Sequence, residues 1–288
     1  MFGAAGVFVR SLLGYGFSGI TVIFLRFTFA AIEMLILILC TDRRLLKIKL
    51  RDLPIFIGTG LGCMFGLNLA YNTSIKYLPL SLAAILLSLA PIVVLIMAAI
   101  LFKEKITARK VICMIAAIIG CALAGGVLEQ QSGSEISGFG IAMGLIAALF
   151  YAMYSILSRI ASNRGNQTYT IIFYSVVLIA LVTIPFAQYD MIAGYVNEAP
   201  VGHILFLIAH ALCISVLPYV FITTALQHAD AGYVSIIASG GEPVAAVFFG
   251  MFFFGEIPTI IGIAGIAITI AALTVLCLKP KTKRDESK

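Results

Sequence analysis

Long apolar stretches separated by short polar ones run along the whole chain. Reading these stretches between charged and turn-forming residues predicts ten membrane-spanning segments, at about 1–13, 17–40, 53–73, 78–102, 107–126, 138–160, 168–188, 203–227, 231–254 and 257–278. In lipid each backbone polar group must be satisfied within its own segment, which a helix achieves. The pattern therefore predicts an all-α polytopic membrane protein with ten transmembrane helices.

Composition supports this fold class. Hydrophobic residues make up 61% of the 288 residues and charged residues 11%, with a mean hydropathy of +1.10. A soluble domain is about 45–50% apolar and about 25% charged, so a soluble globule and a disordered chain are excluded. The net charge of +6 does not indicate a nucleic-acid partner, because the basic residues lie in short runs between apolar stretches.

The basic residues also predict the orientation. Four connections that fall on one side of the membrane carry 16 of the 19 Lys and Arg residues, namely 41–52, 103–110, the turn with Arg159 and Arg164, and the tail 279–288. Lys and Arg concentrate on the cytoplasmic side of membrane proteins. We therefore expect a cell-membrane (cytoplasmic or inner membrane) protein with both termini in the cytoplasm. The connections 127–137 and 189–202 hold no Lys or Arg and are expected as loops on the outer side.

The two halves of the chain share landmarks. A shift of 152 residues places Pro91 on Pro243 and Glu104 on Glu256, and a shift of 149 places Arg10 on Arg159. Each half has five spans, and five is odd, so the second half enters the membrane upside down. This predicts two inverted five-helix repeats, an arrangement that many secondary transporters use to build a midplane site.

The same alignment leaves the first helix about 12 residues shorter than its counterpart. Thirteen residues rise about 20 Å, less than the roughly 30 Å of the hydrocarbon core. We therefore expect a first helix truncated at its N-terminus, with the natural protein beginning upstream or the sequence at hand being a shortened one.

Several short motifs resemble the drug/metabolite transporter superfamily, specifically its ten-helix EamA-type family. They are Leu25-Arg26-Phe27, Leu89-Ala90-Pro91 with Lys103-Glu104-Lys105, and Gly241-Glu242-Pro243 with Gly255-Glu256. The resemblance implies a first EamA repeat at 1–126, an external linker at 127–137, a second repeat at 138–278 and a basic cytoplasmic tail at 279–288. It also implies gradient-driven efflux or exchange of a solute without ATP, and leaves the substrate open.

Three charged residues within the predicted spans are candidates for solute binding or gating. A charge inside a span costs about 2.5–3.5 kcal/mol on insertion scales, so Arg26, Glu33 and Glu242 each call for a function. Arg26 can clamp a solute carboxylate, or form a structural ion pair with Glu33 or Glu242. Glu242 can couple transport to protons, or hold helices together in a paired or neutral form. Glu104 is expected to end its helix and pack at interfacial depth, and His210 to be a packing residue.

Polar side chains on shared helix faces extend the candidate site. They can bind solute or join helices to one another, and are Asn68, Tyr71, Asn72, Tyr151, Tyr154, Tyr174 and Tyr219. Pro91, Pro218 and Pro243 are expected helix bends. No metal site or cofactor is expected, because the six cysteines include no CxxC pair and His occurs three times.

These observations favour a secondary active transporter that exports or exchanges a small organic metabolite, an amino acid or related solute, by alternating access. The alternatives left open are a multidrug or amphiphile exporter and a non-transporting membrane scaffold or channel. An enzyme is not expected, because motifs such as HExxH and GxSxG are missing. The expected partners are a small-molecule solute and the lipid bilayer. Proton coupling and a homodimer also remain open.

Overall fold

Helices form the backbone of each described segment. The computed structural model describes residues 5–78, 80–124, 137–241 and 259–278, and it has no strand among them. The first half contains α1 (Ala5–Gly14), α2 (Gly19–Thr41), α3 (Leu53–Ile57), η4 (Gly58–Phe65), α4 (Gly66–Tyr77), α5 (Leu80–Leu87), α6 (Ala90–Phe102) and α7 (Ala108–Ala124). The second half contains α8 (Gly138–Asn163), α9 (Thr168–Thr183), α10 (Tyr189–Glu198), α11 (Pro200–Ala211), η6 (Leu212–Val216), α12 (Leu217–His228) and α14 (Ile260–Cys277), and residues 231–241 are helical.

Seven of the described helices are long and apolar enough to cross a membrane. They include two continuous rods of 28 and 29 residues, Leu50–Tyr77 and Pro200–His228, each longer than its predicted span. The 17-residue α7 and the 10-residue α1 are shorter. The all-helical fold of a multi-pass membrane protein is confirmed, and the count of ten spans remains a prediction.

Hydroxyl side chains start three of the long helices at the places where the sequence changes from polar to apolar. Ser18, Ser137 and Thr259 each accept a hydrogen bond from the backbone N–H three residues further on. Such N-caps satisfy donors that the first helical turn leaves unpaired. The predicted fourth span is broken between α5 and α6 at Ser88–Leu89, and Pro91 lies in the first turn of α6.

The predicted outer loop at 189–202 is wrong in one respect, since it contains the helix α10. Met191, Ile192, Tyr195 and Val196 recur at helical spacing and pack against a hydrophobic cluster built from α1, α2 and α11. As a helix, this short amphipathic segment buries its apolar side chains on one face. Its ten residues are too few to span a bilayer.

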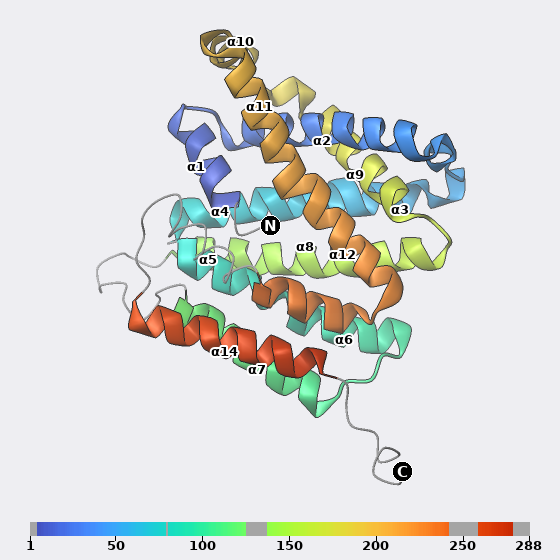
Figure 1. Cartoon of the computed structure of the whole chain (residues 1–288), viewed down its shortest axis with the longest axis vertical. Helices are drawn as coiled ribbons and strands as arrows, with labels where there is room; N and C mark the ends of the chain where they lie inside the picture. The colour runs from blue at the N-terminus through green and yellow to red at the C-terminus, as the bar shows by residue number, and fades with distance from the viewer. Residues whose placement is uncertain (1–4, 79, 125–136, 242–258, 279–288) are drawn as a thin grey trace.

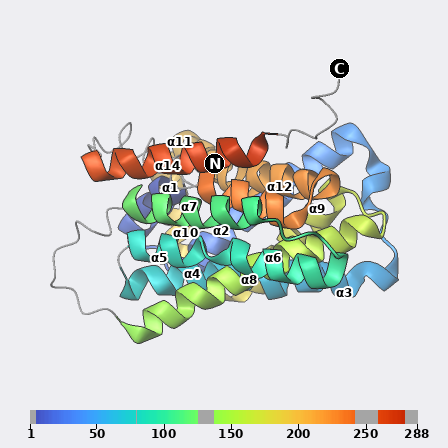
Figure 2. The same ribbon diagram turned by 90° about the horizontal axis from the view of Figure 1, so that it is seen from below.

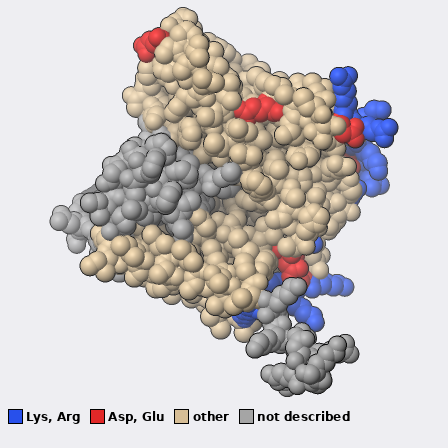
Figure 3. Space-filling model, in the orientation of Figure 1, with Lys and Arg blue, Asp and Glu red and all other residues tan. Residues whose placement is uncertain are grey.

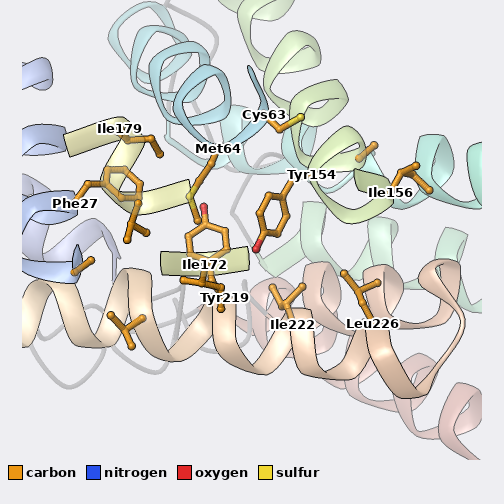
Figure 4. Close-up of a cluster of buried hydrophobic side chains, with 14 of the residues drawn as sticks. Phe27, Cys63, Met64, Tyr154, Ile156, Ile172, Ile179, Tyr219, Ile222 and Leu226 are labelled. Atoms are coloured by element: carbon orange, nitrogen blue, oxygen red, sulfur yellow. The ribbon is translucent and has the colours of Figure 1, made fainter. Parts of the chain in front are cut away.

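The long rod α11–η6–α12 crosses α2 and α9 obliquely, whereas α7 and α14 lie side by side at the opposite edge of the molecule (Figures 1 and 2). The largest core cluster draws residues from α2, η4, α8, α9 and α12, and Figure 4 shows Phe27, Met64, Tyr154 and Tyr219 converging in it. The helices of the two halves therefore meet around one shared core.

The outer surface carries many exposed apolar side chains, as a bilayer requires. Ile100 on α6 is 73% exposed and Ile112 on α7 is 65% exposed. Lys and Arg gather along one edge, over the α2–α3 and α6–α7 connections (Figure 3). We call this edge the basic end, and its exposed basic residues are Arg43, Arg44, Lys47, Lys49, Arg51, Lys103, Lys105 and Arg164.

Candidate functional site

Arg26 is the charged residue of a group of polar side chains from four helices, which we call the polar centre. The group consists of Arg26 on α2, Asn68 on α4, Tyr154 on α8 and Tyr219 on α12. The Arg26 side chain is buried, and its guanidinium lies 4.6 Å above the Phe27 ring. One terminal nitrogen donates a hydrogen bond to Asn68 Oδ1, whereas Nε has no hydrogen-bond partner in the described part of the chain. A guanidinium presents five donors in a planar fork that matches a carboxylate. Arg26 therefore has donor capacity to spare.

Asn68 links Arg26 to an unusual piece of backbone. Its Nδ2 donates to the carbonyl oxygen of Met64 at 2.7 Å, and Met64 belongs to the π-helical segment η4. A π-helix widens the backbone spiral, and such segments occur mostly at functional sites. The amide thus has both its oxygen and its nitrogen engaged, so it holds the Arg26 guanidinium at a fixed position next to η4.

A second π-helical segment lies at the equivalent place in the other half. η6 spans Leu212–Val216, and subtracting 152 from its numbers gives 60–64, which falls within Gly58–Phe65 of η4. Pro218 lies in the first turn of α12, directly after η6. Each half therefore interrupts its long rod at the same depth, next to the polar centre. Sequence reasoning missed both segments, because no residue pattern distinguishes a π turn from an α turn.

His210 lies in the last turn of α11, just before η6, and it is completely buried. Its ring stacks on Phe8 with centroids 5.3 Å apart. Neither ring nitrogen has a hydrogen-bond partner among the residues the structure describes. The expected packing role accounts for the stacking contact and leaves the two nitrogens unexplained.

Tyr154 on α8 and Tyr219 on α12 belong to the same polar centre. Their rings contact at 5.1 Å between centroids with planes 68° apart, and Figure 4 shows them side by side. The Tyr154 hydroxyl lies 2.9 Å from Thr223 Oγ1, so α8 and α12 are joined by a buried hydrogen bond. Both tyrosines are at most 3% exposed, so the pair lies within the core.

Other candidate residues lie elsewhere. Tyr71 and Tyr151 pack together in a separate cluster between α4 and α8, and Asn72 is half-buried on α4. The Tyr174 hydroxyl donates to the Leu46 carbonyl at 2.7 Å near the basic end. That contact places Tyr174 away from the polar centre.

Glu33 lies two turns along α2 from Arg26. Both of its carboxylate oxygens are buried without a hydrogen-bond partner within the described residues. The Arg26–Glu33 ion pair that the sequence left open is absent from the described contacts. Glu242 and Pro243, together with Glu256, lie outside the described residues.

Four charged residues gather at the basic end around the turn that joins α12 to the helix at 231–241. Lys110 forms an ion pair with Asp230 at 2.8 Å. Glu104 accepts backbone N–H bonds from Ala231 at 2.8 Å and from Gly232 at 3.3 Å. Arg159 donates to the Leu226 and Ala229 carbonyls. Glu104 therefore caps a helix of the other half rather than only ending its own.

Three of these residues, Glu104, Arg159 and Asp230, also line a cleft of about 510 Å³ that opens at the basic end. Its walls come from both halves and consist of Phe102, Lys103, Glu104, Lys105, Arg159, Asn163 and Asp230. Within the described residues no group of three or more His, Cys, Asp or Glu side chains could hold a metal ion.

Comparisons with known proteins agree with this architecture. The EamA-like transporter family matches residues 1–126 and 138–278. The chain therefore belongs to the EamA-like transporter family, whose members are transporters and not enzymes.

Three relatives illustrate the match. Two from Archaeoglobus fulgidus (strain ATCC 49558 / DSM 4304 / JCM 9628 / NBRC 100126 / VC-16), both named uncharacterized transporter, are each 25% identical and cover 91% and 96% of this chain and 90% and 92% of their own length. The uncharacterized transporter YxxF of Bacillus subtilis (strain 168) is 24% identical, and the match covers 68% of this chain and 61% of that protein. A crystal structure of a protein 17% identical aligns with a TM-score of 0.74 over 96% of this chain and 93% of its own, which shows the fold alone.

Proposed function

We propose that this protein is a secondary active transporter that binds an anionic group, such as the carboxylate of a small organic metabolite, at Arg26. The observation that carries the proposal is a buried guanidinium with an unpartnered Nε, held by Asn68 where α2 meets η4. A buried charge needs a partner, and a solute carboxylate supplies both the countercharge and the missing acceptors. An amino acid or a related solute meets this requirement.

Alternating access is supported by how the halves meet at the two ends. At the basic end Asp52 accepts from Asn166 at 3.2 Å, and the ion pair between Lys110 and Asp230 also joins the halves. At the opposite end the Thr21 hydroxyl donates to Gln188 Oε1 at 3.1 Å. Polar contacts between the halves therefore close both ends, and breaking one set at a time would expose the centre to one side at a time.

The distribution of charge supports an orientation in which the basic end faces the cytoplasm. This end holds eight exposed Lys and Arg residues, and Lys and Arg concentrate on the cytoplasmic side of membrane proteins. The second candidate, a multidrug or amphiphile exporter, is favoured by the aromatic lining of the centre with Tyr154 and Tyr219. Proton coupling through Glu242 and dimerisation remain predictions.

Uptake into proteoliposomes tests the proposal. Vesicles containing the protein would be offered labelled amino acids, other carboxylates and neutral or cationic amphiphiles, with and without a proton gradient. Arg26→Ala is expected to lower the uptake efficiency of carboxylates by about 30-fold or more, as loss of a buried charge partner does. Arg26→Lys keeps the charge and loses the fork, so it should recover only part of the activity.

The control is Arg43→Ala, which removes an exposed arginine at the basic end and should transport like wild type. Carboxylate uptake unchanged in Arg26→Ala would refute the clamp. Uptake of amphiphiles alone would favour the multidrug alternative. If folded wild-type protein takes up none of these solutes in a saturable way, that result would contradict transport of these solute classes. It would favour the alternative of a non-transporting membrane scaffold.

A further inference from the structure

His210 and Arg26 are two buried polar groups that approach a common interface from different helices. α11 and η6 both pack against α2, and Figure 1 shows the rod crossing that helix. Leu207, three residues before His210 on α11, packs in the same hydrophobic cluster as Leu25, the residue next to Arg26 on α2. Ser215 on η6 also has a buried hydroxyl without a hydrogen-bond partner among the described residues.

An unpartnered buried imidazole is costly. Leaving a buried donor or acceptor unsatisfied costs about 1–3 kcal/mol, and His210 has two such nitrogens. Stacking against Phe8 needs only a flat ring, which phenylalanine provides without that cost. A purely structural role therefore does not explain why this position is a histidine.

We infer that His210 is a second solute-contacting residue, which selects solutes that carry a hydrogen-bonding group beside the carboxylate bound by Arg26. This inference rests on the proposed function and deepens it. A neutral imidazole offers one donor and one acceptor. The carboxylate can accept from the donor nitrogen, and a hydroxyl or amino group next to it can donate to the acceptor nitrogen. A solute with a bare carboxylate leaves the acceptor nitrogen unsatisfied.

The position of His210 also fits this role. It lies two residues before the start of η6, and Asn68 lies three residues after the end of the counterpart η4 and bonds to its Met64 carbonyl. Each π-helical segment therefore has one of these two polar side chains next to it, one in each half of the chain. A solute bound between them would contact both halves at the same time.

Matched pairs of solutes test the inference in proteoliposomes. Each pair would share a carbon skeleton and differ in one group, as lactate differs from propionate and alanine from both. In wild-type protein we expect the hydroxy or amino acid to have the lower KM. His210→Phe keeps a stacking ring and loses both nitrogens, so it should raise the KM of the substituted solute about 10-fold to 100-fold and that of propionate clearly less, because propionate loses only the bond from the donor nitrogen.

His210→Gln keeps a donor and an acceptor without the ring and should recover part of the preference. Phe206→Leu serves as the matched control, because Phe206 packs on Phe8 at 5.1 Å and carries no polar group. The thermal midpoint in detergent establishes that each variant is folded.

The results separate the two proposals. If wild-type protein transports the panel and His210→Phe raises the KM of both members of a pair equally, or of neither, the inference on His210 is overturned and the Arg26 clamp stands. If wild-type protein transports no carboxylate at all, the proposed function itself fails.

Discussion

The hydroxyl pair between α8 and α12 shows how single residues stabilise this core. Tyr154 is 1% exposed and its hydroxyl lies 2.9 Å from Thr223 Oγ1. A hydroxyl that is buried in an apolar surrounding without a partner costs free energy. The loss of stability therefore depends on which of the two hydroxyls is removed, because the other one stays behind unpaired. Measured interhelical hydrogen bonds in membranes contribute about 0.6 kcal/mol on average, with a maximum near 1.7 kcal/mol.

We predict that Thr223→Val destabilises the protein by about 1–2 kcal/mol, because it leaves the Tyr154 hydroxyl buried without a partner. Tyr154→Phe should cost less, and the double variant less than the sum of the single ones. Thermal unfolding in detergent would measure the three values. Additive effects would show that the two hydroxyls do not interact.

At the scale of elements, the tightest contact joins α7 to α14. A Cβ built at Gly120 would lie 2.2 Å from Thr269 Oγ1 and 2.7 Å from the carbonyl oxygen of Gly265. Close approach of helix backbones across small residues is the usual way that helices associate in lipid. The two glycines therefore set the distance between the final helix of each half.

Gly120→Ala is accordingly expected to destabilise the protein by about 1–3 kcal/mol, because the added methyl group forces the two helices apart. Gly62→Ala is the matched control inside the membrane, since no atom lies within 4 Å of its added Cβ. That control should be neutral or slightly stabilising through helix propensity. Unfolding midpoints would compare the two. Equal midpoints would show that the helices can separate at no cost.

At the scale of the whole molecule, charge is distributed between two ends. Lys49 and the seven other exposed basic residues of the basic end lie at one end, whereas the amphipathic helix α10 lies beyond Gln188 at the other. The same two ends hold the polar contacts between the halves. Orientation in the membrane therefore determines which set of contacts closes the cytoplasmic side.

Cysteine labelling in intact cells tests the orientation. In a background without the six native cysteines, Lys49→Cys should resist a membrane-impermeant maleimide until the membrane is permeabilised. Gly194→Cys on α10, where an added Cβ meets no neighbour within 4 Å, should react from outside. The reverse pattern would place the basic end outside and would contradict the proposed orientation.

Much of this architecture follows from local pattern. The apolar stretches predicted the long helices, because burial of backbone polar groups in lipid leaves a helix as the structure of each span. The N-caps Ser18, Ser137 and Thr259 lie within two residues of the predicted starts of three spans, at 17, 138 and 257. Arg26 attracted attention because a charge in an apolar span is costly wherever its neighbours lie.

Other features were decided only by tertiary structure. The π-helical segments, the placement of Tyr174 at the basic end and the capping role of Glu104 depend on which helices meet, and no residue pattern encodes that. His210 was interpreted from its own chemistry as packing, and only the structure shows that both of its nitrogens are buried without a partner among the described residues. The sequence by itself determined the membrane class, the helices and the charged candidates, since these follow from the transfer of each residue between water and lipid. Tertiary structure decided which polar groups share a site, because that depends on contacts between segments far apart in the chain.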